Sequence, residues 1–227
     1  MRDVAVITPT REREANVRRL IGSVTATATG KTDLILAIDD DDATYDDMDL
    51  HPARVFRGPR QDVIGWTNAI AVQLAGEYRA LASFGDDHAP HASPPGLPGW
   101  DERLLALLGG RPGVAYGNDL HRGEALATSW IVSSPVIAAL GYMGPPGLIH
   151  LCMDLFAMQL GMDLENLAYL PDVIIEHHHH SAGKAPWDEG YARANAPSMY
   201  AHDNEAWYRF LQERWPGDLA RLRGKLG

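Results

Sequence analysis

The stretch Leu81-Ala82-Ser83-Phe84-Gly85-Asp86-Asp87-His88 is the segment around which the rest of the sequence is organised. An apolar run ends at Phe84, turns at Gly85 and continues into two acids and a histidine. This pattern is typical of a buried strand whose carboxyl end meets a ligand, as in open α/β sheets, and paired carboxylates there suit Mg²⁺ or Mn²⁺. Taken alone, the octapeptide favours a strand followed by a solvated acidic turn, because short motifs often match by chance. The surrounding sequence has to decide between the two interpretations.

Length and composition indicate a globular protein with a sizeable core. The chain has 227 residues, of which 45% are hydrophobic and 22% charged. Its net charge of −10 argues against a broad, nonspecific nucleic-acid surface, although a local basic groove is compatible with it. Cys152 is the single cysteine, which excludes an intrachain disulfide and fits a reducing compartment. No signal segment precedes the apolar run at Val4 and no run is long enough for a membrane helix, so we expect a cytoplasmic protein.

Strand and helix patterns alternate through the first half of the chain. Short apolar runs predict strands at 3–8, 34–38, 54–56 and 79–84, and helical periodicity predicts helices at 12–24 and 63–75. This order predicts an α/β fold with a mostly parallel central sheet flanked by helices.

The second half is more irregular. A Pro- and Gly-rich loop covers 91–99, and we expect strands at 114–116, 125–132 and 172–176, with helices at 100–108, 135–140, 154–162 and 199–215. We interpret 1–227 as one domain. It divides into a nucleotide-binding half (1–90), an acceptor and catalytic half (91–190) and a helical tail (191–227).

Four consecutive histidines follow the apolar run at 172–176. They are no terminal tag, because 47 residues follow them. If the strand continued, His177 and His179 would face one way and the other two histidines the opposite way. One of the four histidines could complete a metal site begun at Asp86-Asp87-His88; the alternative is a solvated polar strand end.

Polar side chains also end the first two strands. Thr8, Thr10 and Arg11 could hold a nucleotide or phosphate beside a helix N-terminus, or could form a helix cap with a surface arginine. In the acidic run 39–42, one acid could accept hydrogen bonds from a base or ribose, whereas a solvated turn explains most of the run. Neither GxGxxG nor GxxxxGK[ST] occurs, which weakens a dinucleotide-binding or P-loop interpretation.

Further candidates lie in the second half. Asp154 opens a predicted helix and is either a first-turn acid that the helix dipole favours or a general base facing the substrate. Lys184 could pair with a phosphate or be an ordinary exposed lysine. Trp66, Trp130 and Trp187 could stack on a base or sugar, although buried packing is the commoner fate of tryptophan.

Taken together, these segments resemble a GT-A glycosyltransferase of the family 2 type. The resemblance covers residues 3–190 and rests on seven segments in family order, which are 4–11, 38–40, 65–69, 84–88, 116–119, Asp154 and 176–179. It implies that Asp86, Asp87 and His88 stand at the DXD metal motif. It also implies that His177 or His179 is a further ligand of Mn²⁺ or Mg²⁺.

The resemblance also implies a donor and a mechanism. Pro9, Thr10, Arg11 and either Asp39 or Asp41 would hold the nucleotide of a UDP-sugar or another nucleoside-diphosphate sugar. The further candidates for donor binding are Thr8, Asn68, Asp86 and Lys184. Asp154 would deprotonate the acceptor hydroxyl, and a single displacement would invert the anomeric centre. Two departures from the family pattern stand out. His88 replaces the usual acid of the metal motif, so the register of the motif is open, and Met153-Asp154 stands where a Glu-Asp pair is usual.

Small proteins of this type occur in bacteria and phages. The acceptor could therefore be a modified DNA base, a protein or a glycan, and the compartment would be the cytoplasm of the cell or of the phage host.

Other functions stay possible. A sugar-nucleotide nucleotidyltransferase of related fold normally needs a Gly-rich basic loop after the first strand, which residues 9–13 lack. A metal-dependent hydrolase that uses the histidine cluster normally has an HxH or HExxH motif early in the chain, and this sequence has neither there. A catalytically inactive sugar- or nucleotide-binding protein remains open.

Overall fold

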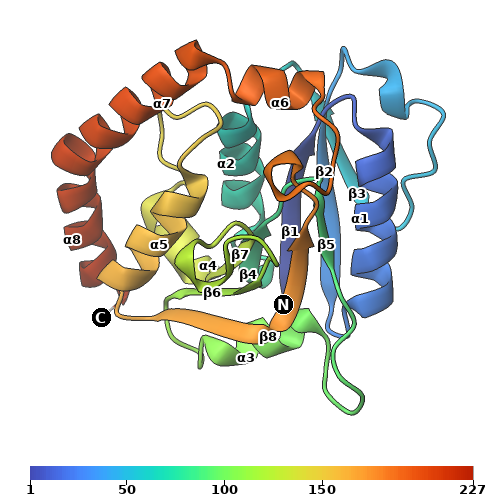
Figure 1. The fold of residues 1–227 in the computed structure, drawn as a ribbon. Helices are drawn as coiled ribbons and strands as arrows, with labels where there is room; N and C mark the ends of the chain where they lie inside the picture. Colours follow the sequence, from blue (N-terminus) through green and yellow to red (C-terminus); the bar gives the residue numbers. More distant parts are fainter. Residues whose placement is uncertain (227) are drawn as a thin grey trace.

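A computed structural model describes residues 1–226, in which a central mixed sheet lies between helices (Figure 1). The strands are β1 Arg2–Thr10, β2 Thr32–Asp39, β3 Arg54–Gly58, β4 Tyr78–Ser83, β5 His88–Pro90, β6 Val114–Asn118, β7 Trp130–Ser133 and β8 Leu167–His177. The α-helices are α1 Glu14–Thr27, α2 Val63–Leu74, α3 Trp100–Leu107, α4 Ser134–Leu140, α5 Met153–Asp163, α6 Glu189–Ala194, α7 Pro197–Arg209 and α8 Trp215–Leu226. Short 3₁₀ turns lie at Ala43–Tyr45, Gly123–Ala125 and His180–Ala182, and a π-helical turn, Phe210–Arg214, joins α7 to α8.

The sheet has the order β3-β2-β1-β4-β7-β6-β8-β5. The four strands β3, β2, β1 and β4 are parallel, as the alternation in the first half of the sequence predicts. In the second half, β7 runs antiparallel to both β4 and β6, β8 is parallel to β6, and β5 is antiparallel to β8. The predicted α/β class is therefore confirmed, with a sheet that becomes mixed beyond β4.

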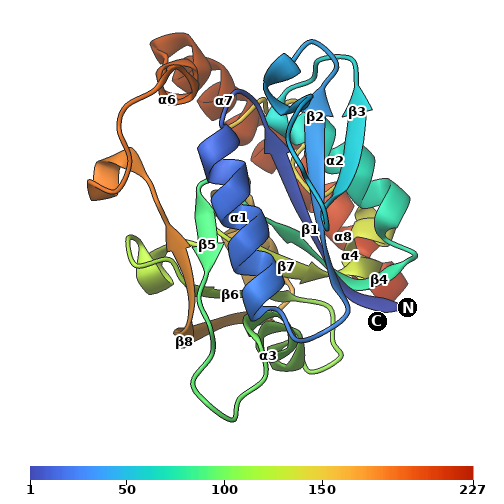
Figure 2. The same cartoon turned by 90° about the vertical axis from the view of Figure 1, so that its right-hand side faces the viewer.

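Successive residues of the central strands enter two different cores. On β1, Val4 and Val6 belong to the core under α1 and α3, whereas Ala5 and Ile7 belong to the core under α2, α4, α5 and α8. Side chains alternate across a strand, so a β1 buried on both faces needs a continuous apolar run rather than alternation. Figure 2 shows α1 on one side of the sheet and α2, α4 and α8 on the other.

Several elements differ from the sequence prediction, and the last strand, β8, begins at Leu167 rather than at 172. The first strand continues through Pro9 to Thr10, because the ladder with β4 stops at Ile7 and leaves a free edge that tolerates proline. The predicted strand 125–132 is confined to β7, since a 3₁₀ turn and a loop precede it. The short elements β5 and α6 were not predicted, because three and six residues carry too little periodic pattern.

The C-terminal tail is a long, nearly continuous helix rather than the single segment 199–215. It packs its aromatic side chains on the body of the protein, where Phe156 of α5 lies edge-on to Phe210 and Trp215. The buried Asp218 of α8 accepts a hydrogen bond of 2.6 Å from the hydroxyl of Tyr142. The tail is thus an integral part of the core on the α2 side of the sheet.

No helix within residues 1–226 has the length and apolar character that crossing a membrane requires.

Candidate active site

A cavity of about 560 Å³ lies at the carboxyl ends of β1, β2 and β4. Its wall is completed by the start of α2, by the loop that leads into α5, by the end of β8 and by the tail segment around α6. Parallel strands gather their carboxyl ends at one edge, which is why side chains from distant parts of the sequence meet here.

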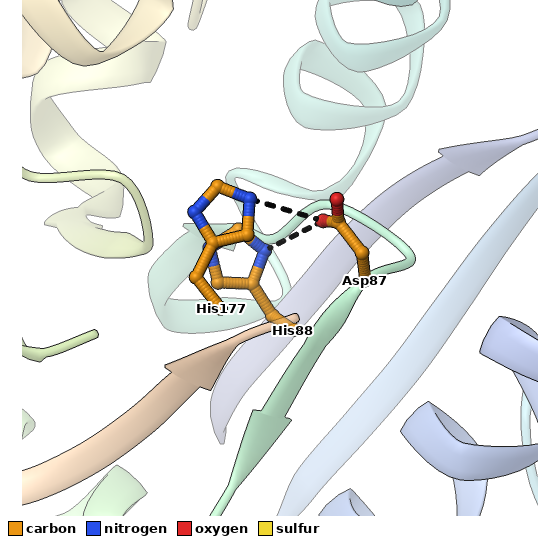
Figure 3. Close-up of side chains that lie close together, drawn as sticks. All are labelled: Asp87, His88 and His177. Atoms are coloured by element: carbon orange, nitrogen blue, oxygen red, sulfur yellow. Dashed lines mark ion pairs between the residues drawn. The ribbon is translucent and has the colours of Figure 1, made fainter. Parts of the chain in front are cut away.

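Three of the predicted metal ligands converge in this cavity (Figure 3). Asp87 and His88 come from the turn between β4 and β5, and His177 is the last residue of β8. Their ligand atoms all lie within 4.8 Å of one another. Asp87 Oδ1 is 3.4 Å from Nδ1 of His88 and 3.4 Å from Nε2 of His177.

The two histidines are brought together by strand pairing. His88 and His177 are partners in the antiparallel ladder of β5 and β8, so their side chains stand on the same face. Their rings stack with centroids 4.2 Å apart. His88 is also fixed through Nδ1, which accepts a hydrogen bond of 3.0 Å from the Gly85 N–H, while its buried Nε2 has no hydrogen-bond partner.

Asp119, which follows β6, stands behind His177. One carboxylate oxygen of Asp119 accepts hydrogen bonds from three backbone N–H groups, at His121, Arg122 and Gly123, and the other lies 3.9 Å from Nδ1 of His177. The Nδ1 atom of His177 therefore faces the Asp119 carboxylate, and its Nε2 atom faces the Asp87 carboxylate. Burial lowers the pKa of His177, but the Asp119 and Asp87 carboxylates outweigh it and raise this pKa to about 9. The separation of 3.9 Å is longer than a hydrogen bond and the buried Nδ1 of His177 has no hydrogen-bond partner, so Asp119 acts on His177 through its charge, from the side where a carboxylate commonly supports a metal-binding histidine.

Asp87 stays ionised in its buried position because its partners are cationic or hydrogen-bonding. Burial alone would raise its pKa, but the contacts with His177 and His88 hold the pKa of Asp87 well below the usual range. Its other oxygen accepts a hydrogen bond of 2.9 Å from the hydroxyl of Tyr191 in α6. Tyr191 lies 104 residues from Asp87 in sequence, and nothing in the sequence pattern pointed to it.

The donor set fits a divalent cation. Two donor atoms bound at about 2.1 Å with an angle of roughly 90–110° between them lie about 3.0–3.4 Å apart, which matches the 3.4 Å separations observed. One carboxylate and two imidazoles suit Mn²⁺ better than Mg²⁺, because Mg²⁺ prefers oxygen ligands. Nδ1 of His88 accepts the Gly85 N–H, so the buried Nε2 carries the ring proton, and a cation at Nδ1 would take the place of that hydrogen bond.

Asp86 does not join this cluster. Its carboxylate accepts hydrogen bonds from Thr10 Oγ1 at 2.7 Å and from Arg13 at 3.1 Å, so it faces β1 and α1. Arg13, which sequence reasoning did not select, reaches further to Asp188 at 2.8 Å and lies over the ring of Tyr191 at 4.3 Å. The tail segment is thereby joined to the turn that carries the candidate metal ligands.

Asp39 lies on the opposite side of the cavity, at the end of β2. One of its oxygens accepts hydrogen bonds from Trp66 Nε1 at 2.7 Å and from the Gln61 N–H at 3.1 Å, and the other accepts one from Arg11 at 3.1 Å. A carboxylate offers about four acceptor positions, so about one is left for a ligand. Pro9, Thr10 and Arg11 also line the cavity, as predicted from their place at the end of β1.

Asp154 lines the cavity from the first turn of α5. Burial raises the pKa of its carboxyl group, although the Leu155 N–H, 2.8 Å from Oδ1, opposes this shift. Cys152, two residues before Asp154, is the N-cap of α5 and has a left-handed backbone with φ of 67°. The candidate base thus enters the cavity from the first helical turn, just after a sharp bend of the chain.

Five further predicted residues, in addition to those described above, lie outside the three-residue cluster. His179 lines the cavity, but the strand ends at His177, so the expected alternation stops and Nδ1 of His179 bonds to Ser181 instead. The other four do not line the cavity: Thr8 is buried, Asp41 pairs with Arg11, Asn68 bonds to the backbone of Met143 and Gly144, and Lys184 pairs with Glu176.

No family model and no curated protein sequence matches the chain. Solved structures of similar fold do match it. GalNAc-T7, determined with UDP, GalNAc and Mn²⁺, superposes with a TM-score of 0.69 at 13% identity, over 96% of this chain and 50% of that one. TarS from S. aureus superposes with a TM-score of 0.57 at 14% identity, over 95% of this chain and 45% of that one. The mannosyltransferase PcManGT from Pyrobaculum calidifontis, solved with GDP-Man and Mn²⁺, superposes with a TM-score of 0.56 at 12% identity, over 99% of this chain and 76% of that one.

This chain spans about half the length of the TarS and GalNAc-T7 chains that it matches. At identities of 12–14%, the likeness concerns the fold. The superpositions agree with the order of the strands and with the position of the cavity at their carboxyl ends. The chain has the GT-A fold of glycosyltransferases, as its sequence motifs predicted.

Proposed function

We propose that this protein transfers a sugar from a nucleoside-diphosphate sugar to an acceptor hydroxyl with the help of a divalent cation. The observation that carries the proposal is the convergence of Asp87, His88 and His177 in one cavity, with Asp39 on one side and Asp154 on another. A nucleotide-holding acid, a cation site and a base around one cavity are the parts that such a transfer needs.

Asp87, His88 and His177 would hold the cation, with Mn²⁺ preferred for its affinity for imidazole. A cation bound there offsets the charge that develops on the departing nucleoside diphosphate. Asp119 keeps His177 in orientation, and Tyr191 does the same for Asp87. PcManGT was solved in complex with GDP-Man and Mn²⁺, and glucosyl-3-phosphoglycerate synthase from Mycobacterium tuberculosis in complex with UDP and Mn²⁺, which supports the same pairing of ion and donor here.

The half of the chain before residue 90 would bind the nucleotide. Asp39 is held by Trp66 and Arg11 at the edge of β2, with capacity left for an N–H of the base or a ribose hydroxyl. Pro9 and Thr10 form the neighbouring wall. UDP-sugars and GDP-sugars are both compatible donors, because uracil and guanine each present ring N–H groups to a carboxylate.

The half after residue 90 would supply the base and the acceptor surface. Asp154 takes the proton of the acceptor hydroxyl, which attacks the anomeric carbon as the bond to the diphosphate breaks. One displacement inverts the anomeric configuration. The proposed acceptor is a hydroxyl of a glycan, a protein or a modified DNA base, and the proposed compartment is the cytoplasm of a bacterium or of a phage host.

Calorimetry with UDP and GDP, each with and without Mn²⁺, tests the donor site. We expect at least one nucleotide to bind in the presence of Mn²⁺ and to bind much more weakly in its absence or to the His177→Ala variant. If neither nucleotide binds with Mn²⁺ present, the proposal is wrong.

The Asp154→Asn variant separates an enzyme from a donor-binding protein. Its carboxamide keeps the shape of the side chain but cannot accept the proton. We expect nucleotide binding to persist and hydrolysis of the sugar donor, with water as acceptor, to be lost. Equal donor turnover in the variant and the parent protein would exclude Asp154 as the base.

A further inference from the structure

The loop that leads into α5 is anchored by a buried acid from the C-terminal tail. Asp203 of α7 is 0% exposed. Its carboxylate accepts hydrogen bonds from three consecutive backbone N–H groups, those of Ile149 at 3.0 Å, His150 at 2.8 Å and Leu151 at 2.6 Å. The three donors converge on one carboxylate, so this single side chain fixes the path of the loop.

The position of these donors matters because they immediately precede the start of α5. Cys152 follows Leu151 with its left-handed backbone, and Asp154 lies in the first helical turn. A shift of the three N–H groups would change where the helix begins and therefore where the Asp154 carboxylate enters the cavity. Burial would raise the pKa of Asp203, but His202 and the loop N–H groups outweigh it, so the anchoring group is an anion.

The same loop is held from its other side by α2. The Ile64 N–H donates to the carbonyl of Ile149 at 3.3 Å, and Asn68 bonds to the backbone of Met143 and Gly144. This explains why Asn68 does not line the cavity: its amide is occupied by the loop. The segment before Asp154 is therefore held between α2 and α7, with the tail supplying the only charged group among these contacts within residues 1–226.

We propose that Asp203 is a positioning residue for the transfer reaction, which acts by holding the Ile149–Leu151 backbone and so placing Asp154. The inference rests on the proposed function in taking Asp154 as the base. It makes the C-terminal helix part of the catalytic apparatus although none of its atoms reacts.

The test compares Asp203→Asn with a matched control, Asp218→Asn. Asp218 is equally a buried tail carboxylate, but it bonds to Tyr142, Arg214 and Arg221 and accepts no hydrogen bond from the backbone of residues 149–151. The asparagine at 203 keeps one acceptor oxygen and sets an amide N–H against the loop donors. Loss of a charged hydrogen bond of this kind predicts a change on the order of tenfold to a hundredfold in loop opening.

The thiol of Cys152 gives a readout that is independent of activity. It is the single cysteine of the chain and is buried beside the anchored residues. With a thiol reagent such as DTNB under native conditions, we expect Asp203→Asn to raise the labelling rate about tenfold or more. Asp218→Asn should label at the parent rate. Equal labelling of Asp203→Asn and the parent overturns the inference.

Donor hydrolysis supplies the second readout. For Asp203→Asn we expect a loss in kcat with Mn²⁺-dependent nucleotide affinity unchanged, because the donor side of the cavity is untouched. A loss confined to nucleotide affinity overturns the positioning role. If Asp203→Asn does not fold, Asp203→Glu takes its place. The glutamate keeps the negative charge, but its side chain is longer by one methylene and so displaces the carboxylate and the loop backbone that it holds. We expect faster labelling and lower kcat from it as well, and parent values of both overturn the inference.

The two proposals fail in different ways. If the thiol labels faster in Asp203→Asn but Asp154→Asn retains full turnover, the loop anchor stands and the assignment of the base is wrong. If Asp154→Asn is inactive while Asp203→Asn has parent labelling and parent kcat, the base stands and the positioning role is refuted.

Discussion

Gly85 allows a perturbation of the candidate cation site that removes none of its ligands. A Cβ at this position would lie 2.7 Å from Oδ1 of Asp87 and 3.0 Å from Nδ1 of His88. Gly85 does not have a positive φ, so an alanine is acceptable to the backbone itself and acts through these two contacts. The substitution Gly85→Ala therefore presses on two proposed ligand atoms at once.

The size of the effect follows from the distances. Ordinary van der Waals contact begins at 3.4 Å, so the Asp87 oxygen has to move by about 0.7 Å from its 2.7 Å position. Metal–ligand distances lie within about 0.2 Å of their standard values, so a shift of this size is large on the scale of the site. We expect the affinity for nucleotide in the presence of Mn²⁺ to fall by about 10- to 100-fold, the range found when the support of a metal ligand is disturbed. Overpacking should cost about 1–3 kcal/mol of folding free energy.

The assay is titration calorimetry of Mn²⁺ with UDP or GDP, with urea unfolding as the check on stability. Gly76→Ala is the matched control, because a Cβ there has no atom within 4 Å and the backbone φ is not positive. It should bind like the parent. If Gly85→Ala also binds Mn²⁺ and nucleotide like the parent while folded, then Asp87 Oδ1 and His88 Nδ1 are not the ligand atoms, and the geometry assigned to the site fails.

Three further outcomes are expected. Asp119→Asn removes the negative charge beside His177. The Mn²⁺-dependent affinity for nucleotide, measured by calorimetry, should therefore drop about 10-fold. An unchanged affinity would show that Asp119 stabilises only its own turn. Burial raises the pKa of Asp154 above the ordinary 3.8, and a base must be ionised to act. The rate of donor hydrolysis should therefore fall as pH decreases through this raised pKa. A rate that falls only at or below pH 3.8 would argue against Asp154 as the base. Phe156→Ala should lower the free energy of unfolding by about 3–5 kcal/mol in urea titrations, since the ring is fully buried against the tail, and a loss below about 1 kcal/mol would mean that the tail is not packed as described.

The sequence predicted the fold where one local pattern was sufficient. The apolar runs of β1, β2 and β4 are continuous because both faces of these strands are buried, and such runs are recognisable without any tertiary information. The positions of Asp39 and Asp87 follow from the same strands, because the residue after a parallel strand lies at the edge of the sheet where ligands bind. The residues of the predicted metal motif therefore line the cavity at this edge of the sheet, and their role in binding a cation stays a prediction.

The remaining parts of the site depend on contacts that no local pattern encodes. His179 was grouped with His177 on the assumption that the strand continued, whereas the chain turns after His177. Tyr191 and Arg13 meet Asp87 and Asp86 only because the tail folds back over the cavity. Side chains at such sequence separations can be located once the packing of the tail is known, and not from the spacing of residue types.

The pairing of His88 with His177 has a consequence for the order in which the protein matures. The two residues are adjacent across the β5–β8 ladder but separated by 89 positions along the chain. A growing chain can complete β1 to β4 and still lack an ion-binding site until β8 has been made and paired. Any Mn²⁺ affinity of this cluster would then appear only once β5 and β8 have paired, and the ion would stabilise that paired state selectively. Metal binding would thus distinguish molecules with this pairing from those without it.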